Sequence, residues 1–162
     1  MKSSKSINKV WLVVCVVLTI FTKNSVLAAE GVFTKTVAPT PVLVLSNSNT
    51  VPSREFANFS VLAADIPSGT LQDPKQISEI RWSTTYYPGT LSEKVELCYF
   101  RSFSAEKDCR DIFPSSSGVL MDFNNQSFGH GSKVTIFHTV LGGTPPYARP
   151  AGVDSVTIKY SY

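Results

Sequence analysis

The chain has 162 residues, 43% of them hydrophobic and 17% charged, which suits one domain with its own core. Its formal charge of +3 arises from 15 Lys and Arg against 12 Asp and Glu, but four of the bases lie in the first 28 residues. The remainder therefore holds eleven bases against twelve acids, a net charge of −1. That balance excludes a basic field that would attract nucleic acid or an anionic membrane surface.

The N-terminal segment has the three parts of a secretory signal. Its first ten residues contain three lysines and no acid, Val10–Phe21 is an apolar block, and VLAAE then supplies small residues for cleavage. The block is shorter than the roughly 20 residues that a helix needs to cross a bilayer. We therefore predict that residues 1–28 are a signal peptide, cut after Ala28 or Ala29, and that no membrane span remains after cleavage.

Beyond the signal, the sequence predicts strands. Short runs of alternating polar and apolar residues lie between Pro, Gly, Ser and Asn clusters, and the one weak helical turn is at Leu71–Ser78. Seven or eight short antiparallel strands predict a single all-β domain over residues 29–162, a small β-sandwich or partly open barrel. The predicted strands are Val32–Val37, Val42–Leu45, Ser53–Leu62, Ile77–Tyr87, Lys94–Phe100, Gly118–Phe123, Ser132–Val140 and Asp154–Tyr162.

The same alternation predicts the core. Phe56 and Phe59 are core candidates, and Trp82 lies at the centre of its strand. The turn signal Pro-Gly predicts that Ile77–Tyr87 and Lys94–Phe100 form an antiparallel hairpin. Two later strands align their apolar side chains on one face, namely Val134, Ile136, His138 and Val140 in the first and Val156, Ile158, Tyr160 and Tyr162 in the second.

Two cysteines, Cys98 and Cys109, remain after the predicted cleavage. A cysteine pair in an exported chain predicts a disulfide. The residues between them are polar, and we expect them to form a solvent-exposed loop. Closing a loop of this size would stabilise the fold by about 3 kcal/mol.

The sequence shows no catalytic constellation. His130 lies in a glycine-flanked turn and His138 on a strand, and no GxSxG, HxxxH or CxxC pattern occurs. We therefore expect no enzymatic activity, no cofactor and no bound metal. A carboxylate pair brought together by folding, as in a secreted hydrolase, is the enzymatic alternative that the sequence leaves open.

Aromatic residues are numerous, with ten Phe and six Tyr. The pairs Tyr86–Tyr87 and Tyr99–Phe100 place one aromatic on each face of a strand, so some rings must be exposed or covered by a partner. We expect a protein-binding surface on one face of Ile77–Phe100. Tyr87, placed opposite the Trp82 face, is the candidate partner-binding residue.

Several segments, in this order, resemble the flagellar protein FlhE family of enteric bacteria. They are EGVFTKTVAPTPVLV, IRWSTTYYPGTLSEKVELC, SGVLMDF, SKVTIFHTVLGG and VDSVTIKYSY. Members of that family are small periplasmic proteins encoded with the flagellar export genes. The resemblance implies a non-enzymatic periplasmic accessory of flagellar assembly. Its partner would be a protein of the flagellar rod or export apparatus, and it would act as a chaperone-like factor or as a plug that limits proton leak.

Two other classes of exported β-protein share features with this chain. A fimbrial or adhesin-type subunit also has a signal, one disulfide and a late alternating strand, but its cysteines usually lie further apart and nearer the N-terminus. An outer-membrane barrel needs strands of about 9–11 residues with a continuous lipid-facing band, and these predicted strands are mostly shorter. The fimbrial subunit is therefore the main alternative.

Overall fold

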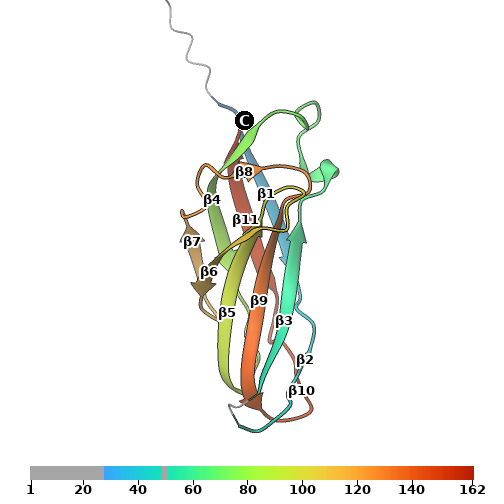
Figure 1. Ribbon diagram of the computed structural model, residues 1–162, viewed down its shortest axis with the longest axis vertical. Helices are drawn as coiled ribbons and strands as arrows, with labels where there is room; N and C mark the ends of the chain where they lie inside the picture. The colour runs from blue at the N-terminus through green and yellow to red at the C-terminus, as the bar shows by residue number, and fades with distance from the viewer. Residues whose placement is uncertain (1–27, 49–50) are drawn as a thin grey trace, which may run out of the picture.

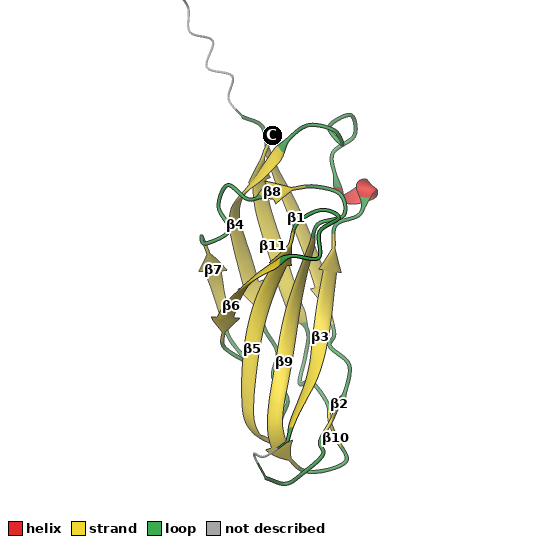
Figure 2. Ribbon diagram, viewed as in Figure 1, coloured by secondary structure: helices red, strands yellow, loops and turns green. Residues whose placement is uncertain are grey.

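The computed structural model describes residues 28–48 and 51–162, so the predicted signal peptide lies almost wholly outside the described residues. The described residues are almost entirely strand and loop (Figure 2). Three of the strands have only two residues, which leaves eight longer ones and confirms the all-β prediction. The elements are β1 Glu30–Val37, β2 Val42–Leu43, β3 Pro52–Ser60, η1 Ala63–Asp65, β4 Lys75–Ser83, β5 Thr90–Phe100, β6 Lys107–Ile112, β7 Ser117–Leu120, β8 Ser127–Phe128, β9 Lys133–Gly143, β10 Tyr147–Ala148 and β11 Asp154–Ser161.

Nine of the described strands form two antiparallel sheets that lie one behind the other. The first sheet has the order β1-β11-β4-β7, with β8 also paired to β4, and the second has the order β3-β9-β5-β6. In Figure 1 the second sheet lies in front of the first. A ribbon of β2 and β10 lies at the lower end of the molecule in that view. No helix in the described ranges is long and apolar enough to cross a membrane.

The core lies between the two sheets. Along β11, buried and half-buried residues alternate, with Val156, Ile158 and Tyr160 on the buried side. The alternating residues of β9 that were predicted to share a face are also buried. Strands with a period of two place every second side chain on one face, which explains why these faces could be predicted. The main core cluster also includes Phe33, Phe59, Ile77, Ile80, Trp82, Val95, Leu97, Tyr99, Phe123 and Phe128.

The predicted hairpin of Ile77–Tyr87 with Lys94–Phe100 is wrong. β4 pairs with β11, β7 and β8 in the first sheet, whereas β5 pairs with β9 and β6 in the second. Residues 84–89 cross from one sheet to the other. Packed sheets lie about 10 Å apart, a distance that these residues can span. Alternation indicates which face of a strand is buried, but it does not indicate which strand lies beside it.

Three smaller predictions are also corrected. Phe59 is fully buried but Phe56 is 49% exposed, because residues three apart on a strand point to opposite faces. The helical turn expected at Leu71–Ser78 does not form, since β4 begins at Lys75. The segment around Cys109, expected to be a loop, is strand β6.

Candidate functional site

The outer face of the second sheet carries an unusual set of side chains. Antiparallel register places residues of four neighbouring strands in rows across the sheet, all pointing away from the core. The rows, from β3 to β6, are Phe56, Phe137, Glu96, Asp111; then Asn58, Thr135, Cys98, Cys109; then Ser60, Lys133, Phe100, Lys107. Aromatic and charged groups thus lie side by side on one surface, which we call the outer aromatic face.

The aromatic rings of this face surround a shallow hollow. Its volume is about 230 Å³, and it lies over β3, β9 and β5. Phe56 and Phe137 meet edge to face with ring centroids 6.0 Å apart. Phe56 keeps about half of its surface in contact with solvent. The hollow is lined by Phe56, Asn58, Phe100, Lys133, Thr135 and Phe137.

Cations lie over two of these rings. The Arg54 guanidinium carbon is 4.0 Å from the centroid of Phe137, and Lys133 Nζ is 4.3 Å from that of Phe100. Lys107 Nζ is 5.5 Å from the Phe137 centroid. Such cation–π contacts are worth about 0.5–1 kcal/mol at exposed sites. They hold positive charge close to the apolar floor of the hollow.

The predicted disulfide is confirmed, and it lies on the same face. Cys98 of β5 and Cys109 of β6 are directly opposite each other, with Cα atoms 4.0 Å apart. The bridge joins the edge strand β6 to the sheet in the middle of the outer aromatic face. The disulfide therefore stabilises the surface on which the rings are displayed.

The outer face of the first sheet is different. It presents mainly Thr, Ser and ion-paired side chains. The hydroxyls of Thr34 and Thr157 are 3.0 Å apart, and the Glu79 carboxylate accepts hydrogen bonds from Arg81 and Lys159. These ionic contacts lower the pKa of the Glu79 carboxyl, first through the hydrogen bond from Lys159. Apolar surface is confined to single valines on its edge strands. The two outer faces of the sandwich thus differ in chemistry.

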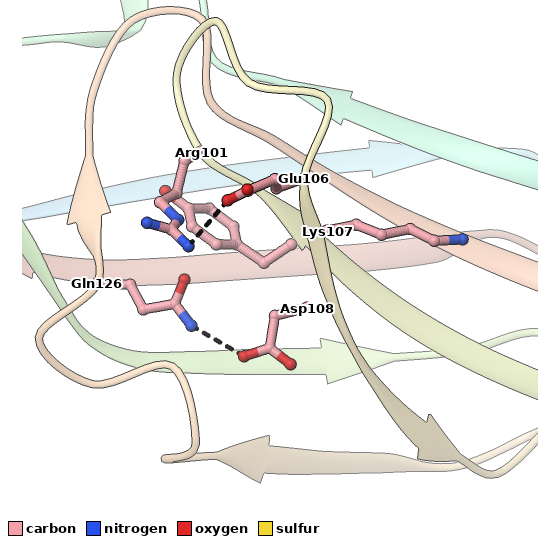
Figure 3. Close-up of a pocket in the computed structure, with 6 residues that line it drawn as sticks. Arg101, Glu106, Lys107, Asp108 and Gln126 are labelled. Carbon is pink, nitrogen blue, oxygen red and sulfur yellow. Dashed lines mark hydrogen bonds and ion pairs between the residues drawn. The ribbon is translucent and has the colours of Figure 1, made fainter.

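A second hollow lies at the end of the β5–β6 hairpin. Its volume is about 390 Å³, and Figure 3 shows the charged side chains that line it. Arg101 and Glu106 form an ion pair at 3.5 Å, and the Gln126 amide donates to Asp108 at 3.0 Å. Lys107 points away from these groups, toward the outer aromatic face (Figure 3). Because the charges of this hollow are paired with one another, it offers less to a ligand than the outer aromatic face.

His138 is at the centre of a buried ionic cluster. Its Nδ1 donates to Glu93 at 2.6 Å and its Nε2 donates to Asp154 at 2.9 Å. Burial lowers the pKa of the imidazole, but the hydrogen bonds and charges of Asp154 and Glu93 outweigh it and raise this pKa to about 9. The ring is therefore an imidazolium at neutral pH, held between two carboxylates.

This cluster lies inside the sandwich. The side chains of His138 and Asp154 are fully buried and that of Glu93 is almost so. The sequence pattern could have indicated this cluster. Glu93 and His138 each fall at an alternate position of their strand that otherwise holds core residues. A polar residue at a core position needs a buried partner.

The other histidine, His130, lies in a turn against the ring of Phe103.

Tyr87 does not lie on the surface, so its selection as an exposed binding residue is corrected. Its side chain is 1% exposed, its hydroxyl donates to the carbonyl of Thr40 at 2.6 Å, and its ring meets that of His138 edge to face. The alternation of β4 ends at Ser83, so a face cannot be extrapolated to residue 87. Its neighbour Tyr86 is the exposed member of the pair, at 42%.

No metal centre can be assembled from the described residues, since no group of three or more His, Cys, Asp or Glu side chains could hold an ion. The buried cluster consists of hydrogen-bonded partners that face one another. The outer aromatic face, by contrast, is exposed and has a hollow over β3, β9 and β5.

Comparison with known proteins identifies the fold. No family model and no curated protein matches the chain. A crystal structure of FlhE superposes with a TM-score of 0.51 and 18% sequence identity, over 83% of this chain and 100% of that one. Two further structures reach TM-scores of only 0.35 and 0.27. The first is a structure of infectious bursal disease virus, with 11% sequence identity over 83% of this chain and 32% of that one. The second is a structure of TmCBM61 in complex with beta-1,4-galactotriose, with 8% identity over 82% of this chain and 86% of that one. The chain thus has an FlhE-like fold.

Proposed function

We propose that the protein is a periplasmic accessory of flagellar assembly that acts by binding another protein and not by catalysis. The observation that carries the proposal is the FlhE-like fold, which spans the whole of the FlhE chain. It agrees with the order of segments that resemble that family in the sequence. The Cys98–Cys109 disulfide adds support, because disulfides persist in oxidising compartments such as the periplasm.

Binding is favoured over catalysis by where the polar groups lie. The one cluster with a raised histidine pKa is sealed between the sheets, whereas the outer aromatic face is open to solvent. An exposed surface that combines aromatic rings with cations is typical of protein interfaces. We therefore assign the outer aromatic face as the binding surface.

The partner in this proposal is a component of the flagellar rod or of the export apparatus. Two roles fit a small rigid β-domain there. It could hold an exported subunit as a chaperone-like factor, or it could occupy an opening and limit the leak of protons. Both roles need an exposed binding face and no substrate turnover.

A fimbrial subunit is not favoured by the strand pairing. Such subunits lack a strand and are completed by a strand from a chaperone or a neighbour. Here β1 pairs with β11 over its full length, from Glu30 opposite Ser161 to Val37 opposite Asp154. The first sheet is thus completed by the chain's own N-terminal strand.

The proposal is tested by deleting the gene and measuring swimming, swarming and the proton tightness of the membrane. We expect at least one of these to fail and the wild-type gene to restore it. A Phe56→Ala variant should restore it poorly, because Phe56 is on the outer aromatic face. The matched control is Val32→Ala, which removes an exposed apolar side chain from the other outer face. A deletion strain with normal motility and proton gradient that loses surface fibres would overturn the proposal.

A further inference from the structure

We propose that the hollow on the outer aromatic face binds an acidic segment of the partner protein, in which a carboxylate lies next to an apolar side chain. The inference rests on the proposed function in that it names the chemistry of the protein that is bound.

The acids of the outer aromatic face are already engaged. Glu96 accepts a hydrogen bond from the Arg54 guanidinium at 2.6 Å. The Lys94 ammonium lies 3.5 Å from Glu96 and 3.1 Å from Asp111. Four charged groups at one end of the face thus balance one another. A cation of the partner would find no unpaired acid there.

The cations at the other end are not balanced. Lys133 and Lys107 form no ion pair with any described residue, and both extend over phenylalanine rings. They lie on either side of Phe100 in the row that runs across β9, β5 and β6. This end of the face is therefore positive, although the chain beyond residue 28 carries a net charge of −1. Its complement is a negatively charged group.

The floor between these cations is apolar. Phe56 is about half exposed and packs edge to face with Phe137, and Phe100 closes the other side of the hollow. A bare anion would gain nothing from this floor, but a segment with an apolar residue beside its carboxylate would bury both. A volume of about 230 Å³ is enough for side chains and too small for a folded element.

A sugar fits the hollow less well than an acidic peptide. Sugars stack on open faces of aromatic rings, but Arg54, Lys107 and Lys133 already lie over two of the three rings. The Asn58 amide oxygen, which could accept from a sugar hydroxyl, already accepts from Thr135 at 2.7 Å. The donors around the hollow are the ammonium groups and the amide nitrogen of Asn58, and the charged ones form their strongest hydrogen bonds with carboxylates.

The test uses the exported protein purified from the periplasm and fluorescein-labelled peptides followed by anisotropy. The probe is Gly-Phe-Glu-Glu-Phe-Gly, and the matched peptide has glutamine in place of both glutamates. We expect the acidic peptide to bind and the amide peptide to bind at least about fivefold more weakly. Raising NaCl from about 50 mM to about 500 mM should weaken only the acidic peptide, because exposed charges are screened.

Single variants locate the site. Lys133→Gln and Lys107→Gln should each weaken the acidic peptide by up to about fivefold, since each removes one exposed ion pair. Lys159→Gln removes the same charge from the outer face of the first sheet and should leave the affinity unchanged. Equal affinity for both peptides, or an equal loss with Lys159→Gln, would overturn the inference.

A β-linked glucan tetrasaccharide serves as the competing probe. If it binds to wild type and loses affinity with Phe56→Ala while neither peptide binds, the hollow is a sugar site and the inference is wrong. Failure of this inference is distinguishable from failure of the proposed function. If the acidic peptide does not bind but the deletion strain is non-motile, only the inference is rejected. If the peptide binds but the deletion strain is fully motile, the flagellar role is rejected.

Discussion

The Asp154 carboxylate accepts a hydrogen bond from His138 Nε2 at 2.9 Å, and this contact joins β11 of the first sheet to β9 of the second. Asp154 also accepts from the backbone N–H of Thr85 at 2.8 Å, and Glu93 accepts from that of Tyr87 at 2.9 Å. The buried cluster therefore holds the crossing segment at two points. Its position indicates a structural role, which is to fix where the chain passes from one sheet to the other.

Replacing His138 should strongly destabilise the fold. A His138→Leu variant leaves the carboxylates of Glu93 and Asp154 buried without their cation, and breaking such a pair costs about 3–5 kcal/mol. Urea unfolding of both proteins at neutral pH measures the difference in the free energy of unfolding. Lys159→Gln, which breaks an exposed ion pair, should cost less than about 1 kcal/mol. Equal losses in the two variants would contradict the structural role of the cluster.

The cluster should also make stability depend on pH. Because folding raises the pKa of His138 to about 9 from about 6.5, its stabilising contribution is complete below about pH 6.5 and is lost as the pH rises through about 9. The full contribution is on the order of 3 kcal/mol. Urea midpoints of wild type and His138→Leu, compared between about pH 6 and pH 10, should converge as the pH rises. Parallel curves would show that the imidazole does not titrate in this way.

The two adjacent tyrosines should differ in how strongly their mutation lowers stability. Tyr87→Phe removes the hydrogen bond to the Thr40 carbonyl and should lower the free energy of unfolding by about 1 kcal/mol. Tyr87→Ala should cost about 3–5 kcal/mol, because the ring is buried. Tyr86→Ala should stay within about 0.5 kcal/mol of wild type. Thermal unfolding followed by circular dichroism measures all three, and a neutral Tyr87→Ala would contradict its burial.

The disulfide should contribute about 3 kcal/mol to stability, the value expected for a loop of this size. The double variant Cys98→Ala with Cys109→Ala removes it without leaving a free thiol. Its urea midpoint should fall below that of the oxidised wild type and match that of the reduced wild type. Mass spectrometry of the unreduced native protein should show the loss of two hydrogens, and two alkylatable thiols would rule the bridge out.

The exported protein should begin at Ala29 or Glu30. The structure gives this cut a further consequence, because Ala29 and Tyr162 exchange two backbone hydrogen bonds of 2.9 Å. A cut after Ala28 keeps these bonds, and a cut after Ala29 removes them but leaves β1 intact. N-terminal sequencing of the periplasmic form decides between the two. A mature form that still begins at Met1 would refute the signal peptide.

The fold class could be predicted because its signals are local. Alternation along β9 and β11 indicated their buried faces, and two cysteines in a chain predicted to be exported indicated the bridge. Prediction failed where a strand ended, as at Tyr87, since a period of two gives no information beyond the last paired residue. It also failed at β6, whose polar sequence resembles a loop and becomes a strand by pairing with β5.

The sequence by itself determined that this protein is an all-β domain with a disulfide, and which sides of β9 and β11 would face the core. Only the tertiary structure decided which strands are neighbours. The outer aromatic face brings together Phe56, Phe100 and Phe137 from three strands, and the buried cluster joins His138 to Glu93 and Asp154. The physical reason is that the buried face of a strand can be predicted from the alternation of residues that are close in sequence. Strand pairing instead joins residues far apart along the chain, and many pairings would satisfy the same local pattern.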